Sequence, residues 1–113
     1  ALMMKGQLDL ALTEYRKSAQ LDPSFAFPYL NIANIQMQTK NIPAAIENFE
    51  KALSINPAMP AVHLSLGMVY HQFQENKEKT LEHLKESLRL APKQQRSESI
   101  QSLIKKLENK QPT

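Results

Sequence analysis

The sequence contains no cysteine. Disulfide bonds and thiolate metal sites are therefore excluded, and cysteine usage gives no information about the compartment. Only two glycines are present, Gly6 and Gly67, and they lie too far apart to form a phosphate-binding loop. No apolar run approaches the roughly 18 residues that span a bilayer, and the short apolar start does not resemble a signal peptide. We therefore expect no membrane insertion.

Side chains capable of catalysis are present, but none of them forms a catalytic or metal-binding motif. The three histidines, His63, His71 and His83, are never four residues apart. His71 and Glu75 have i, i+4 spacing, which we interpret as a surface ion pair rather than a metal site. No serine lies in a nucleophile elbow. We predict a noncatalytic protein with no catalytic residues, no cofactor and no metal site.

The chain has 113 residues and a net charge of +3, enough for one small domain with a modest core. Residues 1–92 contain nine Lys/Arg and nine Asp/Glu, whereas residues 93–113 contain five and two. The basic C-terminal stretch has no aromatic residue, so we interpret it as a solvated helix and predict no nucleic-acid binding. Because the chain begins at Ala1 within an apolar run, we expect it to be part of a longer protein.

A repeat is evident from three prolines that end similar tripeptides. Pro23 and Pro57 are 34 residues apart, and Pro57 and Pro92 are 35 apart. Proline cannot continue a helix and disfavours helix at the preceding residue, so each proline should end a unit. Small and large residues alternate at helical spacing before each proline: Ala11, Tyr15 and Ser18, then Ala45, Phe49 and Ala52, then Thr80, Leu84 and Ser87.

A second apolar-periodic helix precedes this one in the middle and last units. Its small residue, Ala33 or Gly67, marks a close approach between helices. In the first unit only residues 1–5 remain of it, and we expect Gly6 to end that helix as a C-terminal glycine does. Asn41 is the expected cap of the helix that starts at Ile42. The extra residue of the last unit should fall within residues 72–79, between the paired helices.

This 34-residue pattern of paired helices ending in proline resembles the tetratricopeptide repeat. The resemblance implies an all-α, right-handed α-solenoid of helix–turn–helix repeats. It divides the chain into a partial repeat (1–23), a complete repeat (24–57), a complete repeat with one inserted residue (58–92), and a C-terminal capping helix and tail (93–113). The sequence departs from the family pattern at four positions: Gln36, His63, Thr80 and Leu84.

The two ends of the stack are expected to differ. Ile100, Leu103, Ile104 and Leu107 form one stripe of a helix whose other face is polar, as a capping helix requires. No such cap is predicted at the N-terminal end. Its apolar side chains could therefore support self-association: Leu2, Met3, Met4, Leu8 and Leu12.

The family resemblance implies that the first helix of each pair lines a concave peptide groove. Carrying the family's groove positions onto this chain gives Phe27, Leu30, Asn31, Asn34, Met37, Gln38, Ala61, Leu64, Ser65, Met68, His71 and Gln72, of which Leu30 and Leu64 are expected to be partly buried. Ala61 and Ser65 stand where a carboxylate-clamping member needs Lys and Arg, so we do not predict a carboxylate clamp.

We predict a protein-interaction module, a scaffold or adaptor, that binds a peptide segment of a protein partner. Two alternatives remain open: a regulatory or substrate-recruiting region of a larger enzyme, and a homo-oligomerisation module.

Overall fold

The computed structural model of the protein describes residues 2–109, with side chains from residue 6 onward. Every secondary-structure element in that range is an α-helix, which confirms the predicted fold class. The helices form two compact units, Ala1–Pro57 and Ala58–Thr113. Unit 1 contains α1 (Leu2–Leu21), α2 (Phe27–Gln38) and α3 (Ile42–Ile55). Unit 2 contains α4 (Pro60–Phe73), α5 (Lys77–Leu90) and α6 (Ser97–Asn109).

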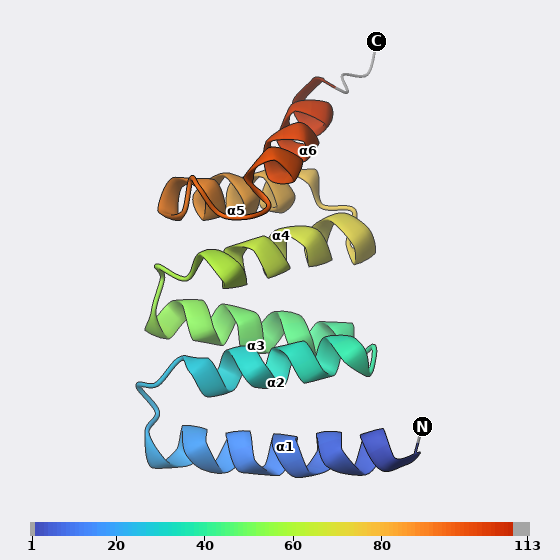
Figure 1. Cartoon of the computed structure of the whole chain (residues 1–113), viewed down its shortest axis with the longest axis vertical. Helices are drawn as coiled ribbons and strands as arrows, with labels where there is room; N and C mark the ends of the chain where they lie inside the picture. The colour runs from blue at the N-terminus through green and yellow to red at the C-terminus, as the bar shows by residue number, and fades with distance from the viewer. Residues whose placement is uncertain (1, 110–113) are drawn as a thin grey trace. The chain divides into compact units, whose positions relative to one another are not determined.

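In unit 1, α2 packs against both α1 and α3 (Figure 1). The predicted packing residues of the middle repeat are confirmed, since Ala33, Ala45, Phe49 and Ala52 are all fully buried. Small residues let the two backbones approach closely, and the buried Phe49 ring fills the remaining space beside them. Pro28 lies in the first turn of α2, where its missing N–H removes no helical hydrogen bond.

The expected helix end at Gly6 is wrong. Helix α1 runs through Gly6 without a break, and Gly6 does not have the positive φ of a left-handed C-terminal cap. Continuing the helix keeps its backbone hydrogen bonds. The first segment is thus one helix rather than the end of one helix followed by another.

Three residues, Thr39–Asn41, connect α2 to α3. Lys40 has φ of 64°, and the Asn41 N–H donates to the carbonyl of Gln36 at 2.8 Å. This left-handed turn satisfies carbonyls at the end of α2. Asn41 occupies the expected N-cap position, but its side chain makes no capping hydrogen bond.

In unit 2, α4 and α5 form the corresponding pair (Figure 1). Leu66, Gly67, Thr80, Leu84 and Ser87 are buried between them. A Cβ atom placed on Gly67 would lie 2.9 Å from Cδ2 of Leu84. The close approach predicted for Gly67 is therefore present.

The extra residue of unit 2 lengthens α4 and not the turn. Gln74–Asn76 also number three residues, as in unit 1. Glu75 has φ of 48°, and the Asn76 N–H donates to the carbonyl of Tyr70. That bond spans six residues where the Asn41 to Gln36 bond spans five. The insertion therefore lies between Tyr70 and Asn76, where the last turn of α4 absorbs it.

Helix α6 packs on α5 through the predicted stripe. Ile100 and Ile104 are buried against Leu84, and Leu103 packs beside them. Lys85 of α5 also donates to Glu108 of α6 at 2.6 Å. Because both side chains are about half exposed, this ion pair contributes little stability beside the apolar contact.

Two expectations fall partly beyond the described residues. The tail at 110–113 lies outside them, as do the side chains of Leu2, Met3 and Met4 in the N-terminal edge. Leu8 and Leu12 of that edge are half-buried. The repeat boundaries stay predictions.

Candidate functional site

The predicted site residues of unit 1 follow one helix, and we call them the α2 row: Phe27, Asn31, Asn34, Met37 and Gln38. Asn34 and Gln38 are exposed, whereas Asn31 and Met37 are half-buried. The buried side of α2 is formed by other residues, among them Ile32, Ala33 and Ile35. The row therefore lies beside the packed face and not within it. Leu30 is half-buried, as expected.

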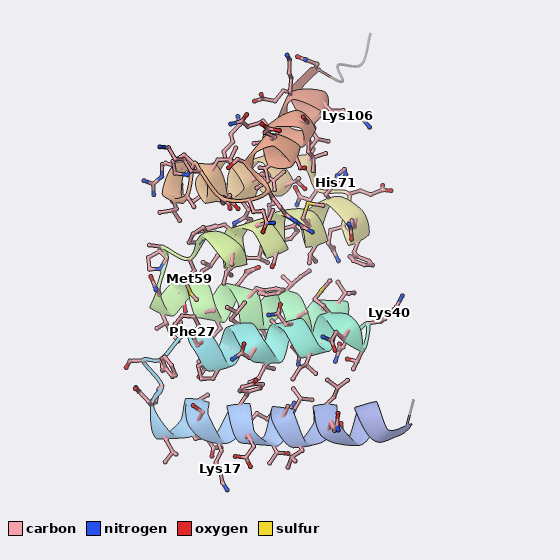
Figure 2. All side chains as sticks on the ribbon, viewed as in Figure 1. Lys17, Phe27, Lys40, Met59, His71 and Lys106 are labelled. Atoms are coloured by element: carbon pink, nitrogen blue, oxygen red, sulfur yellow. The ribbon has the colours of Figure 1, made fainter. Side chains whose placement is uncertain are left out.

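Phe27 begins the α2 row at the corner between α1 and α2, as Figure 2 shows. Phe27 is 53% exposed, and its ring contacts that of Phe25 edge to face, with centroids 5.6 Å apart. Phe25 and Leu21 are also exposed. Sequence reasoning did not single out Leu21 and Phe25, because they lie at and beyond the end of a helix, where periodicity carries no information.

The predicted residues of unit 2 form the α4 row: Ser65, Met68, His71 and Gln72. Gln72 is exposed, and the other three are half-buried. Met68, together with Leu64, packs against the Leu84, Ile100 and Ile104 cluster. Helix α6 therefore covers part of the α4 row. This cover was not expected from the sequence.

His71 lies near the end of α4 (Figure 2) and lines a pocket of about 280 Å³ with Glu75, Asn76, Lys77 and Leu107. The predicted ion pair between His71 and Glu75 is wrong, because neither residue takes part in the salt bridges of the described residues, which join Lys85 to Glu108 and Arg89 to Glu86. Glu75 lies beyond the end of α4 in a left-handed conformation. Helical i, i+4 geometry therefore does not apply to it.

The two helix pairs carry different polar contacts at their interfaces. In unit 1, Asn48 Nδ2 donates to Gln36 Oε1 at 2.9 Å and to the Ala44 carbonyl at 3.1 Å. Lys51 Nζ lies 5.0 Å from the centre of the Tyr29 ring, close enough for a cation–π contact. These residues connect α2 to α3, so we assign Gln36 to packing rather than to the exposed surface.

In unit 2 the corresponding contact is a pair of histidines. His63 Nδ1 and His83 Nδ1 are 3.0 Å apart, and the ring centroids are 5.2 Å apart. His83 also stacks on Tyr70, with centroids 5.8 Å apart and planes inclined by 6°. No local pattern predicted this cluster, because His63 and His83 lie on different helices, twenty positions apart.

The histidine pair has the geometry of a hydrogen bond and not of a metal site. When the two Nδ1 atoms are 3.0 Å apart, a distance of 5.2 Å between the ring centroids is close to the largest possible. The two nitrogens therefore face each other almost head-on. One Nδ1 must donate and the other accept, so the two rings differ in tautomer or charge. A metal ligand pair would instead direct both lone pairs at a third point. In the described range, no three His, Cys, Asp or Glu side chains are grouped to hold a metal ion.

Among the described residues, one ion pair within a single helix shifts the pKa of both its partners. Arg89 donates to both carboxylate oxygens of Glu86, at 2.8 and 2.5 Å. These hydrogen bonds lower the pKa of the Glu86 carboxyl and raise the pKa of the Arg89 guanidinium. Because the pair is solvent-exposed on α5, it has the character of a solvated surface contact and not of a catalytic group.

A second pocket, of about 210 Å³, lies between α4 and α6. Its lining consists of Leu64, Met68, Arg96, Ser99, Ile100 and Leu103. Sequence reasoning favoured a cap over a partner-binding helix for α6 and did not predict a pocket that contains Arg96. The signal was available, because Arg96, Ile100 and Leu103 recur at helical spacing and place a cation beside an apolar stripe.

None of the described helices is both long and apolar enough to cross a membrane.

The chain's family follows from comparison with known proteins. A family model described as TPR repeat matches residues 1–40 and 33–73. These matches cover more than half of the chain, so the protein belongs to the tetratricopeptide repeat family. Two Arabidopsis thaliana proteins are similar in sequence. Protein CTR9 homolog is 32% identical over 69 residues, and Anaphase-promoting complex subunit 6 is 36% identical over 86 residues.

These matches cover 61% and 71% of this chain, but only 6% and 16% of the two relatives. The chain thus spans a small part of the relatives that it matches.

Solved structures share the fold. The first TPR of Spaghetti (RPAP3), bound to HSP90 peptide SRMEEVD, matches with a TM-score of 0.77 and 19% identity, over 94% of this chain and 81% of that one. The Yersinia enterocolitica type III secretion chaperone SycD, in complex with a peptide of the translocator YopD, matches with a TM-score of 0.79 and 12% identity, over 94% and 83%. At such identities the likeness shows the fold alone.

Proposed function

We propose that this chain is a noncatalytic interaction module, and that the α2 row of unit 1 and the α4 row of unit 2 each offer a surface for a peptide segment of a protein partner. One observation carries the proposal. Neither α2 nor α4 contains a single Asp, Glu, Lys or Arg, whereas α3 and α5 contain several. Side chains of α2 and α4 that do not pack are therefore uncharged: amides, hydroxyls, imidazole, thioethers and the rings of Phe27 and Phe73. Covering such groups with a peptide costs less than covering unpaired charges, provided that the polar ones find hydrogen-bond partners.

The two rows offer groups that suit an extended peptide. The exposed amides of Asn34, Gln38 and Gln72 each have a donor and an acceptor, so they can pair with main-chain N–H and C=O groups. Met37 and Met68 are half-buried and flexible, and can adapt to varied apolar side chains. Asn31, Ser65 and His71 would add polar contacts. Family members whose structures hold bound peptides support the same use of the fold.

The experiment is a paired loss-of-binding test. The chain is immobilised, and captured proteins are identified by mass spectrometry. Binding of the recovered partner is then titrated against the double variant Asn34→Ala and His71→Ala. We expect binding weaker by about tenfold, because the double variant removes one proposed polar contact from each row, worth about 1 kcal/mol or less apiece. The control is Glu47→Ala with Glu82→Ala, two exposed residues on α3 and α5. Equal affinity of the first variant and the parent would refute the assignment of these residues.

Homo-oligomerisation is a second candidate, favoured by the surface of α1. Leu10 and Leu21 are 63% and 83% exposed. They are eleven residues apart, about three helical turns, and so lie on the same side of α1. Two copies could bury these side chains against each other. Sedimentation velocity at increasing concentration tests this: a dimer in the parent that Leu10→Ser abolishes would support it, and a monomer at all concentrations would exclude it.

A regulatory or substrate-recruiting role in a larger enzyme stays a prediction. The sequence of the full-length protein would test it directly.

A further inference from the structure

The histidine pair that joins α4 to α5 is a titratable contact inside a helix interface. His63 is only 8% exposed, and His83 is half-buried. Their Nδ1 atoms are 3.0 Å apart, which is hydrogen-bonding distance and leaves no room for a water molecule between them. The two nitrogens can therefore separate only if a ring turns or the helices move apart. The protonation of one ring consequently depends on that of the other.

The contact accepts two charge states and excludes a third. With no charge on the pair, one Nδ1 donates its hydrogen to the other. With one charge, the imidazolium donates to the neutral ring, and a hydrogen bond from a charged donor is stronger than a neutral one. With two charges, both Nδ1 atoms carry hydrogens that point at each other, and neither nitrogen is an acceptor. Two positive rings at this distance also repel each other.

The helices around the pair supply little that would compensate a second charge. Tyr70 of α4 stacks on the His83 ring and is 6% exposed. Lys79 of α5 places its Nζ 5.2 Å from the centre of the Tyr70 ring, so it adds positive charge to the same group of side chains. Helix α4 contains no acidic residue. On α6, which packs on α5, Glu108 is bonded to Lys85.

The acidic residue that acts on both rings is Glu86, one turn after His83 on α5. The pKa of its carboxyl is lowered first by the hydrogen bond from Arg89, and further by the charges of Arg89, His63 and His83. The same attraction favours a first proton on the histidine pair. Because Arg89 already donates to both oxygens of Glu86, a second proton gains little from this carboxylate. Glu82, the residue before His83, is exposed and lies on another face of the helix.

We propose that the contact between His63 and His83 makes the packing of α4 on α5 sensitive to acid, because the folded pair holds at most one positive charge. In the unfolded chain the two side chains are separate, and each gains a proton below a pH of about 6.5. Below that pH the unfolded chain therefore binds one proton more at these positions than the folded chain does. By linkage, stability then falls as the pH falls.

The acid sensitivity of this contact goes beyond the proposed function and is independent of it. Helix α4 carries both His63 and the α4 row, so acid would loosen the packing of the helix that presents the row. This holds whatever the row binds. At pH 7.5 separate histidines are mostly neutral, so the difference in bound protons disappears and the packing is at full strength.

The first test is urea denaturation of the full chain at several pH values between 7.5 and 5, followed by circular dichroism. Two independent sites in the unfolded chain, against one proton shared by the folded pair, predict that the unfolding equilibrium constant rises by roughly tenfold over this range. The variants His83→Asn and His63→Asn should each lose that part of the rise. Asparagine places its amide near the position of Nδ1 and can donate or accept, but does not titrate.

The matched control is His71→Asn. It makes the same chemical change on α4 at the third histidine, which lines the pocket with Glu75 and lies away from the pair. This variant should retain the rise. Other groups that titrate in this range are common to the parent and to all three variants, so the comparison isolates the pair.

A second measurement needs no variant to fold. Two-bond ¹H–¹⁵N correlation spectra of the histidine rings show which nitrogen carries a hydrogen. At pH 7.5 we expect one of the two rings, and not both, to carry a hydrogen on Nδ1. During acidification the two rings together should take up a single proton while the chain stays folded.

Three results would overturn the proposal. One is the same pH dependence of unfolding in the parent, His63→Asn and His83→Asn. Another is loss of the rise in His71→Asn as well, because the pair would then not be its source. The third is a hydrogen on Nε2 alone in both rings at pH 7.5, since the two Nδ1 atoms would then have no hydrogen between them. None of these readouts involves a peptide, so failure of this proposal and failure of the proposed function are distinguishable.

Discussion

The tightest helix contact in unit 2 gives the sharpest stability prediction. A Cβ atom on Gly67 would approach Leu84 Cδ2 to 2.9 Å and Cγ to 3.0 Å, and the Leu84 backbone N to 3.4 Å. Leu84 has no exposed surface, so its side chain cannot swing into solvent. Gly67→Leu adds three further carbon atoms and should destabilise by about 1–3 kcal/mol through overpacking. Gly67→Ala should be milder, because alanine regains about 0.5–1 kcal/mol of helix propensity.

The chain contains a matched control for this substitution. Gly6 is also within a helix, and a Cβ atom there would meet no heavy atom within 4 Å. Gly6→Ala should therefore stabilise by about 0.5–1 kcal/mol, through helix propensity alone. Replacing glycine by alanine should therefore stabilise the protein at Gly6. At Gly67 the contact with Leu84 opposes the same gain, to the extent that the Leu84 side chain cannot shift.

The assay is urea denaturation followed by far-UV circular dichroism, with a double-mutant cycle. Leu84→Ala alone should cost about 2–5 kcal/mol by opening a cavity. In the double variant, Gly67→Leu fills that cavity, so the two effects should be non-additive by about 1 kcal/mol or more. An unchanged midpoint for Gly67→Leu, or strictly additive effects in the cycle, would refute the close packing of α4 on α5.

Three further stability predictions can be checked by the same denaturation experiment. Phe49→Ala should cost about 3–5 kcal/mol, because the ring is fully buried; a loss below about 1 kcal/mol would contradict its place in the core. Ser87→Ala should cost about 1–3 kcal/mol, since the buried hydroxyl donates to the Pro60 carbonyl at 2.9 Å, and a neutral result would mean that water replaces it. Lys40→Gly should stabilise by about 0.5–1 kcal/mol, because φ of 64° is strained for lysine; destabilisation would show that this turn is not left-handed in solution.

The helix pairs could be predicted from the sequence because their packing slots repeat. Ala45, Phe49 and Ala52 recur in phase with residues of the neighbouring repeats, and helical spacing alone places them on one face. The same reasoning failed at Gly6. A glycine ends a helix only where the chain beyond it gains contacts by turning back, and those contacts depend on residues distant from the glycine itself. Lys40 and Glu75 make the left-handed turns instead, although neither residue type favours that conformation.

The candidate site could be predicted less completely. The α2 row came from the groove positions of the family, and the structure leaves Asn34 and Gln38 of it exposed; its role in binding stays a prediction. The pocket between α4 and α6 depends on how the two helices pack, which no local pattern encodes. The prediction of a cap was correct in the apolar stripe of α6, yet it did not place Arg96 beside that stripe. A capping helix and a pocket wall require the same stripe, so only the packing distinguishes them.

The four departures from the family pattern now have a common explanation. Gln36 accepts a hydrogen bond from Asn48 of the paired helix, and His63 contacts His83 of its own paired helix. Thr80 bonds to the Asn76 carbonyl, and Leu84 lies against Gly67. Each unusual residue therefore has a partner suited to it, within the same helix pair or turn. Restoring a family-typical residue at one position alone would change one side of such a contact and leave the other side unchanged. These positions are for that reason coupled packing sites, and we assign binding to the uncharged side chains beside them.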